Sequence, residues 1–384
     1  MARASSHTER VLTAVHTDRA GRIVVATDYG AAALFGGQGR ALEEGIPLPP
    51  DARVAPLPDR DAVGIDRQGH PRSLGAHRWA AAAILAPGHL RTRLPACVVR
   101  DDLPPLEPLG YAAVAADADG SLVVAAVPTG EARAAAAPTD ADLAAAITAG
   151  LRAHPSSVVL RQLARGARED QGGGAAAIFL ARGNAPLPVG DDRITAADLA
   201  DIAIAHLDGG GDGVTFGLAG QRDPLDRPRV VADAAGRVRA ALPAARIGVR
   251  TNAAVAAAIA RVAGSGVDAV TVPLSSARAE TYERLLPARE IRWPDVRGGI
   301  RQAVASGLAV TIELLVLPGL TDRVEEIDAL VSVLRELPSG STLRLRDLAA
   351  DPYLLLRANP GGEPLGIEVA LARLRAEAPQ VRLA

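Results

Sequence analysis

The sequence holds one cysteine, Cys97, among its 384 residues. A lone cysteine cannot form an internal disulfide, so cysteine usage does not fix the redox compartment. It also excludes every metal site for which the chain must supply two or more thiolates. The histidines show no metal-ligand spacing with one another, so we predict no metal site.

Lysine is absent, and aromatic residues make up only 2% of the chain. Arginine supplies every cationic side chain, but the arginines are spread out and form no basic run. The net charge is −2, and few rings are present on which bases could stack, so the chain lacks the features of a nucleic-acid binder. The abundance of Ala, Gly, Pro and Arg is typical of a GC-rich genome.

Long hydrophobic runs are also absent. The longest, such as residues 79–86, fall well short of the roughly 20 apolar residues that span a bilayer. Residues 1–7 lead into a mixed sequence with no apolar core, which argues against a signal peptide. We therefore predict a soluble, cytoplasmic protein with no membrane partner.

The first part of the chain, residues 1–130, predicts a small, mostly β domain. Its apolar runs are short and are broken by Gly, Pro and Asp. The expected strands are 22–26, 79–85, 111–115 and 121–127. The turn residues Asp-Ala-Asp-Gly at 117–120 predict that the last two strands form a hairpin.

Residues 131–183 predict a helical linker, and residues 184–384 then alternate strand and helix. The expected strands are short and almost continuously apolar, as buried parallel strands are. They cover 185–189, 213–216, 246–251, 268–274, 309–317 and 342–348. The amphipathic segments expected as helices cover 195–207, with Thr195 as N-cap, 254–263, 295–306, 324–337 and 368–378. Six βα units in order predict an α/β fold, a partial (β/α)6 TIM-like barrel.

Several short segments resemble one known family through their order and spacing. They are Val-Thr-Phe-Gly at 214–217, Val-Arg-Thr-Asn-Ala at 249–253, Val-Pro-Leu-Ser-Ser-Ala-Arg at 272–278 and Leu-Val-Leu-Pro-Gly-Leu-Thr-Asp at 315–322, with further matches at 109–114, 161–164 and 186–189. The chain is similar to the radical S-adenosylmethionine (SAM) superfamily, and more closely to an uncharacterised subgroup with an N-terminal β domain. The resemblance implies a partial (β/α)6 barrel, in agreement with the six units.

The family's chemistry requires residues that this chain lacks. A Cys-x3-Cys-x2-Cys loop after the first barrel strand holds a [4Fe–4S] cluster, whose open iron binds the amino and carboxylate groups of SAM. Here Gly-Asp-Asp-Arg-Ile at 190–194 leads directly into a helix, so the loop is missing. Gly166 and Gly172 stand where the subgroup tends to have further cysteines. We therefore expect no [4Fe–4S] cluster and interpret the chain as a degenerate member.

Other positions that the family uses to hold SAM are also altered. Gly217 ends the second strand, and the turn that receives the methionine amino group corresponds to 220–224. Asp223 keeps the acid of that turn, but Arg222 replaces a glycine that allows close backbone approach. Arg250 and Ser275 stand where close relatives often show asparagine. The resemblance thus implies SAM as a candidate ligand, but several of the positions that hold SAM in the family carry other residues here.

Polar residues gather at the expected carboxyl ends of the strands, where barrel enzymes place their catalytic groups. They are Arg250, Asn252, Ser275, Glu313, Arg344 and Arg346. Period-2 alternation places Arg250 with Asn252, and likewise Arg344 with Arg346, on common faces. Glu313 interrupts an apolar strand, and a buried carboxylate needs a partner, for which arginine is well suited.

Three interpretations of these side chains stay open. An arginine pairs with Glu313 and takes the place of polar interactions that the family makes with its cofactor; or the arginines form a pocket for a carboxylate or phosphate; or Glu313 is a catalytic acid/base. Gly217 and Asp223 complete the candidate ligand-binding residues.

At the level of function, the first hypothesis is a cluster-free pseudoenzyme that binds a small anionic or SAM-like ligand or regulates a protein partner. The second is a barrel enzyme repurposed for redox-neutral chemistry on an anionic substrate. The third is a scaffold for a cysteine-bearing relative.

Overall fold

The computed structural model describes residues 12–85, 88–100, 103–129, 184–187, 189, 194–217, 222–285 and 291–384. The predicted linker 131–183, with its expected helices, lies outside these residues. So do Gly166, Gly172 and residues 190–193 of the segment that follows the first barrel strand. The domain limits at 130 and 183 therefore stay predictions.

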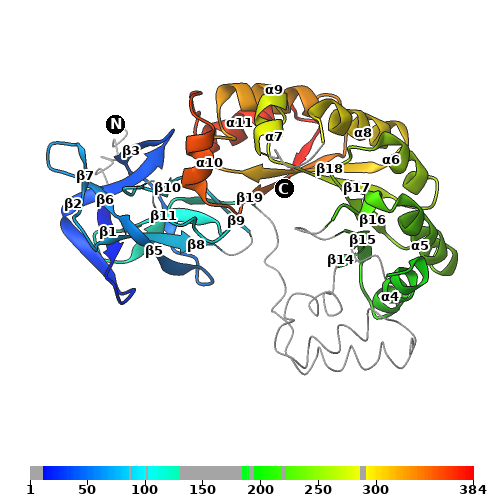
Figure 1. The fold of residues 1–384 in the computed structure, drawn as a ribbon, viewed down its shortest axis with the longest axis horizontal. Coiled ribbons are helices and arrows are strands. Elements are labelled where there is room, and N and C mark those ends of the chain that lie inside the picture. Colours follow the sequence, from blue (N-terminus) through cyan, green and yellow to red (C-terminus); the bar gives the residue numbers. More distant parts are fainter. Residues whose placement is uncertain are drawn as a thin grey trace, which may run out of the picture.

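The N-terminal part is built of antiparallel strands, drawn in blue and cyan in Figure 1. The strands are β1 (Thr13–Thr17), β2 (Ile23–Phe35), β3 (Gln38–Ala41), β4 (Ile46–Pro47), β5 (Arg53–Asp61), β6 (Val63–Ile65), β7 (Pro71–Ser73), β8 (Trp79–Ile84), β9 (His89–Arg91), β10 (Leu94–Pro95), β11 (Tyr111–Ala116), β12 (Leu122–Val124) and β13 (Ala126–Pro128). The main sheet runs β4-β12-β11-β8-β1-β2-β6-β7, with β3 and β10 on β2 and β5 on β8, while β13 pairs with β9. The prediction of a mostly β N-terminal domain is confirmed.

The predicted hairpin is present between β11 and β12, which pair antiparallel from Val114↔Val124 to Ala116↔Leu122. The backbone N–H of Asp117 donates to the Ser121 carbonyl at 2.8 Å and closes the turn. Gly120 has φ +82°, a conformation that glycine adopts without strain. The Asp and Gly residues of this segment therefore set the turn, as the sequence predicts.

The C-terminal part contains a parallel sheet whose strands follow chain order. They are β14 (Asn184–Leu187), β15 (Gly213–Phe216), β16 (Ile247–Arg250), β17 (Ala269–Leu274), β18 (Ala309–Val316), β19 (Thr342–Asp347) and the short β20 (Arg382–Leu383). Each strand pairs in parallel with the next. The six predicted strands are confirmed to within two residues at their ends. Among the described residues the two outer strands do not pair, so the sheet is an open, partial barrel.

Helices cover one side of this sheet, and Figure 1 shows α5, α6, α8 and α9 in an arc outside the strands. The helices are α4 (Ala196–Asp208), α5 (Pro228–Ala241), α6 (Ala256–Ala263), α7 (Ala279–Leu285), α8 (Trp293–Ala305), α9 (Val324–Leu334), α10 (Pro352–Ala358) and α11 (Ile367–Glu377), with a short 3-10 turn at Pro224–Asp226. Thr195 caps α4 as predicted, in a capping box with Asp198.

The sequence analysis missed α5, α7 and α10. The signal for α5 was present, because Pro228 stands in its first turn and Val231, Ala234, Ala235 and Val238 recur at helical spacing. The helices α7 and α10 have seven residues each, too few for a clear period.

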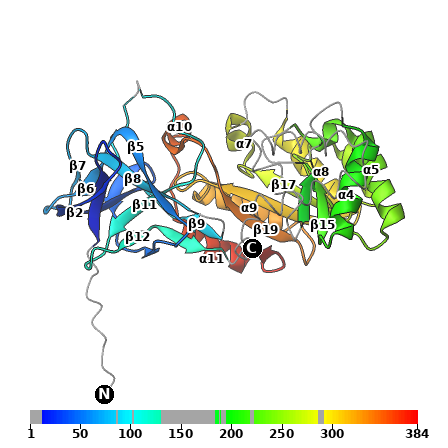
Figure 2. The same ribbon diagram turned by 90° about the horizontal axis from the view of Figure 1, so that it is seen from below.

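The β domain packs against the barrel at the ends of β18 and β19, and Figures 1 and 2 both show α10 beside the β strands. Tyr353 of α10 is buried in the core of the β domain and donates to the Pro95 carbonyl at 2.9 Å. A second apolar group joins Leu94 of the β domain to Leu317 and Leu320 of the barrel. The two parts therefore share a buried interface.

Candidate ligand-binding site

The two faces of the parallel sheet carry different residues because strand side chains alternate. On the outer face, side chains such as Val249, Val272, Ile312 and Leu343 are buried beneath the helices. On the inner face, the residues between them are mostly smaller or polar and only half-buried, among them Thr271 and Thr311. The outer face is thus the core of the barrel, and the inner face is the one that could receive a ligand.

Glu313 lies on the inner face and is bracketed by two arginines. Its Oε1 accepts from Nη2 of Arg250 at 2.6 Å, and its Oε2 accepts from Nε of Arg346 at 3.3 Å. The register places Arg344 directly opposite Glu313 on the neighbouring strand. The sequence prediction that an arginine pairs with Glu313 is confirmed, with two arginines from two different strands.

Burial differs sharply within this group. The Glu313 side chain is 7% exposed, whereas those of Arg250 and Arg346 are 21% and 43% exposed. The carboxylate is therefore held inside, and the outer parts of the two guanidinium groups reach solvent. Arg250 can contact a second anion without leaving Glu313, because a guanidinium carries five N–H donors.

Ser275 directly follows β17, and its hydroxyl, like that of Ser341, is buried without a hydrogen-bond partner in the described part of the chain. The residue is 8% exposed, and its Oγ makes no hydrogen bond in the structure. A buried polar group without a partner costs free energy and calls for an explanation. By continuation of the β17–β18 register, Ser275 lies level with Leu315, which pairs with Arg346. Its alternation with Pro273 places it on the inner face. We define Arg250, Ser275, Glu313, Arg344 and Arg346 as the inner-face site.

The structure gives Asp223 a role in holding loops together. One carboxylate oxygen accepts from the Leu225 N–H at 2.8 Å, and the other accepts from the Asn252 N–H at 2.6 Å. The Thr251 hydroxyl donates to the same carboxylate. This carboxylate ties the loop after β15 to the loop after β16, and its four contacts leave it little capacity for a ligand.

Gly217 and Asn252 serve the backbone of these same loops. Gly217 has φ +107°, and a Cβ there would lie 2.6 Å from the Arg250 carbonyl oxygen, so only glycine fits. The Asn252 side chain accepts from the Ala254 N–H at 2.8 Å and forms a local turn. Both residues shape the barrel mouth beside Arg250, and their contact with a ligand stays a prediction.

In the Pro-Gly-Leu-Thr-Asp turn at 318–322, the polar side chains form hydrogen bonds to the backbone of the turn itself. The Thr321 hydroxyl accepts from the Leu317 N–H at 2.9 Å, and the Asp322 carboxylate accepts from the Gly319 N–H at 2.6 Å. Burial raises the pKa of Asp322. Leu320 of the same turn is fully buried in the domain interface. This turn therefore begins α9 and supports the β domain, and it is not open to a ligand.

Arg91 of the β domain reaches the ends of two barrel strands. It is fully buried, and its Nη2 donates to the Leu348 carbonyl at 2.7 Å and to the Val316 carbonyl at 3.4 Å. Its Nε lies 3.4 Å from Oδ1 of Asp347, whose pKa is raised by burial. The sequence analysis did not single out Arg91, because its partners lie about 250 residues away in the chain.

The number and position of the cysteines do not fit an iron–sulfur cluster. Cys97 lies in the β domain, and burial raises the pKa of its thiol to about 11, so the thiolate that binds iron is disfavoured. Three such thiolates are needed, and the chain has this one cysteine. Within the described ranges, no group of three or more His, Cys, Asp or Glu side chains is placed to hold a metal ion.

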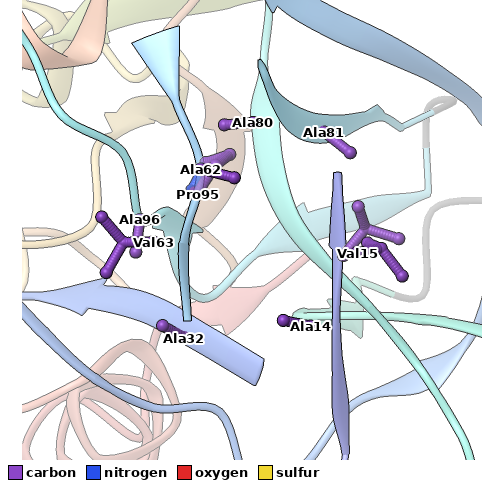
Figure 3. A pocket seen from close by; sticks show the side chains of 10 residues that line it. Ala14, Val15, Ala32, Ala62, Val63, Ala80, Ala81, Pro95 and Ala96 are labelled. Atoms are coloured by element: carbon purple, nitrogen blue, oxygen red, sulfur yellow. The ribbon is translucent and has the colours of Figure 1, made fainter. Parts of the chain in front are cut away.

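A small cavity lies between strands of the β domain (Figure 3). Its lining consists of apolar side chains: Ala14, Val15, Ala32, Ala62, Val63, Ala80, Ala81, Pro95, Ala96 and Val114. The cavity volume is about 10 Å³, which is room for no more than about one water. It is therefore too small for a substrate.

Where the structure describes the chain, no helix is both long and apolar enough to cross a membrane.

Comparison with known proteins finds similarity to solved structures. Radical SAM enzymes are among them. A radical SAM methyltransferase from Sphaerobacter thermophilus is 18% identical, with a TM-score of 0.35 over 49% of this chain and 57% of that one. Methylornithine synthase is 13% identical, with a TM-score of 0.35 over 64% of this chain and 81% of that one. HydG, a maturase of the [FeFe]-hydrogenase, is 14% identical, with a TM-score of 0.38 over 64% of this chain and 62% of that one.

No family model matches the chain, and no curated protein sequence matches it. The assignment of roles to residues rests on the contacts described above.

Proposed function

We propose that this chain is a radical SAM-like barrel protein that works without an iron–sulfur cluster and binds a small anion at the inner-face site. The observation that carries the proposal is the pair of arginines that converge on Glu313 from two strands. Both guanidinium groups remain partly exposed, and Arg250 has N–H donors beyond the one that it gives to Glu313, so it can engage a further anion. The absence of two of the three cluster thiolates supports the cluster-free part.

Glu313 is better placed as an internal counter-ion than as a catalytic acid/base. Both of its oxygens are engaged by guanidinium groups, and only 7% of its side chain is exposed. A general base must reach the proton of a bound substrate, and these hydrogen bonds occupy the oxygens that would do so. The protein-partner and scaffold hypotheses stay predictions, to be checked by the oligomeric state and by co-purification from the native cells.

The anion part of the proposal is tested by calorimetry on the purified chain with inorganic phosphate, acetate and SAM as probes. We expect saturable binding of at least one probe. R250M should weaken that binding at least tenfold, because it removes a charge-assisted hydrogen bond. R237M is the matched control, since Arg237 is exposed on α5 in the outer layer. Absence of saturable binding, or equal losses of affinity in both variants, would contradict the proposal.

The cluster-free part is tested separately by anaerobic reconstitution with ferrous iron and sulfide, followed by reduction in the presence of SAM. We expect iron at well below four atoms per chain and no 5′-deoxyadenosine. A stoichiometric [4Fe–4S] cluster that cleaves SAM would overturn it.

A further inference from the structure

A row of polar side chains crosses the inner face beside Glu313. Arg250 on β16 pairs in register with Thr271 on β17, and Thr271 pairs with Thr311 on β18. All three alternate along their strands with residues of the buried outer core, so all three side chains face inward. We call Arg250, Thr271 and Thr311 the polar row. Glu313 lies two residues beyond Thr311, which is one inward-facing step nearer the carboxyl end of β18.

The Arg250 side chain crosses β17 within this arrangement. Its Nη2 donates to Glu313 at 2.6 Å, although β17 lies between β16 and β18 in the sheet. Neighbouring strands are about 4.8 Å apart, so the side chain must extend over β17 to make this contact. Thr271 is the residue of β17 at the level of Arg250, and Thr311 flanks it on β18. The guanidinium and the two hydroxyls are therefore neighbours.

The two hydroxyls have capacity for a ligand. Thr271 and Thr311 are half-buried, and neither hydroxyl makes a hydrogen bond in the part of the chain that the structure describes. A threonine hydroxyl both donates and accepts, whereas a guanidinium only donates. The polar row therefore places a contact for an anion beside two groups that can bond a hydroxyl group.

The spacing of the threonines suits one shared oxygen atom. Because Thr271 and Thr311 are paired in register, their side chains are separated by about one strand spacing, or 4.8 Å. A hydrogen bond between two oxygens spans about 2.8 Å. One ligand oxygen between the two hydroxyls can therefore bond both, accepting from one threonine and donating to the other if it is itself a hydroxyl.

The inward-facing row on the other side of the polar row consists of small residues. Gly248, Ala269 and Ala309 pair with one another across the same three strands. Small side chains project little from a sheet, so they do not cover the two hydroxyls, and Ala309 is itself exposed. A small molecule that lies across β16 to β18 meets no bulky side chain in this row.

We infer that the anion bound at the inner-face site is a carboxylate with a hydroxyl group on the neighbouring carbon atom, as in a 2-hydroxy acid. This inference rests on the proposed function and specifies its ligand class. The carboxylate accepts from the Arg250 guanidinium. The hydroxyl group of the ligand lies between the hydroxyls of Thr271 and Thr311.

A carboxylate suits this position better than a phosphate does. The ligand shares the Arg250 guanidinium with Glu313, and the repulsion between Glu313 and the ligand grows with the charge of the ligand. A planar guanidinium also matches the two coplanar oxygens of a carboxylate, which it binds through two parallel N–H donors. A singly charged, planar group is therefore favoured.

The inference is tested by calorimetry on the full chain near pH 7.5 with acetate, glycolate and inorganic phosphate as probes. Glycolate differs from acetate by the hydroxyl group in question. We expect glycolate to bind about fivefold tighter than acetate, because it makes additional hydrogen bonds, and tighter than phosphate. Equal affinity for acetate and glycolate, or a preference for phosphate, would overturn the inference while leaving the proposed function standing. If acetate, glycolate, phosphate and SAM all fail to bind, both are overturned.

The variants T271V and T311V test the position of the ligand hydroxyl. Valine keeps the branched shape of threonine and lacks its hydroxyl. We expect each variant to reduce the preference for glycolate over acetate and the double variant T271V/T311V to abolish it, while the affinity for acetate changes less than about twofold. T27V is the matched control, since Thr27 is exposed on β2 of the β domain. A preference for glycolate that persists in a folded T271V/T311V protein would overturn the inference.

Discussion

The two faces of the parallel sheet use the same strands for different purposes. On β18, Ile312 faces outward and is fully buried under the helices, while Thr311 and Glu313 face inward. The outer face gains its stability from apolar burial, which needs no particular partner. The inner face holds its charges only through specific pairs such as Arg250 with Glu313. Neighbouring residues of each strand therefore serve different purposes: one stabilises the core beneath the helices, and the next faces the inner side, where a ligand could bind.

The largest effect should come from a cavity on the outer face. We expect I312A to lower the free energy of unfolding by about 4 kcal/mol, because a fully buried side chain is removed from a packed core. T311A, one residue away on the inner face, should cost less than about 1 kcal/mol. Urea unfolding of both variants measures the difference. Similar decreases in the free energy of unfolding of I312A and T311A would contradict the distinction between the two faces.

Arg91 tests a buried charged contact at the outer-face end of β19, where it pairs with Asp347. R91M should cost about 3 kcal/mol, since it breaks a buried pair and removes the hydrogen bond to the Leu348 carbonyl. The cost should stay at the low end of the range, because burial already raises the pKa of Asp347 and protonation can relieve its charge.

The control is R93M, because Arg93 is partly exposed and pairs with the exposed Glu368. We expect R93M to change stability by less than about 1 kcal/mol. If thermal unfolding shows that R93M lowers stability as much as R91M does, the buried Arg91–Asp347 contact does not stabilise the protein more than an exposed pair.

Glu313 tests whether the inner-face charges depend on one another. E313Q should lower the free energy of unfolding by about 1 to 2 kcal/mol, less than for a fully buried pair because both arginines reach solvent. R250M combined with E313Q should cost less than the sum of the single variants, since the pair is broken only once. Strict additivity in a double-mutant cycle would show that the two side chains are not coupled.

The smallest effect concerns a charge on the helices, away from both faces. Hydrogen bonds from Arg301 and Arg297 lower the pKa of Glu336 to about 2, from an ordinary value of 4.5. A lowered pKa in the folded state stabilises the protein above pH 4.5, and this stabilisation is lost as the pH falls from about 4.5 toward 2. The Glu336 side chain is about one-third exposed, so the contribution is about 1 kcal/mol or less.

E336Q should remove this pH dependence and leave the rest of the acid unfolding profile in place. Parallel thermal unfolding of the two proteins between pH 5 and pH 2 would show the expected convergence at low pH. A constant gap across that range would contradict it.

Much of the fold could be predicted from the sequence because the barrel strands are short apolar runs with clear limits. The strands 213–216 and 309–317 are recognised from composition alone, and β15 and β18 occupy almost the same residues. Helices shorter than two turns, such as α7 and α10, have no measurable period and were missed. In the β domain, β5 was missed because Pro56, Pro58 and Asp59 interrupt its apolar pattern.

The candidate site was predicted in part. Alternation placed Arg250 and Arg346 on the inner face, and the cost of burying Glu313 pointed to an arginine partner. The orphan hydroxyl of Ser275 could not be foreseen, because the absence of a partner is a property of three-dimensional packing. The same holds for Asp223, whose partners come from a different loop.

The central claim is that the inner-face site of the barrel binds a small anion. Crystals of the protein grown with tungstate, a tetrahedral dianion with strong anomalous scattering, test it most directly. The account predicts an anomalous peak at the inner-face site, within hydrogen-bond distance of the Arg250 guanidinium. Well-ordered crystals that show bound tungstate elsewhere, or no peak at the inner face at saturating concentration, would contradict it.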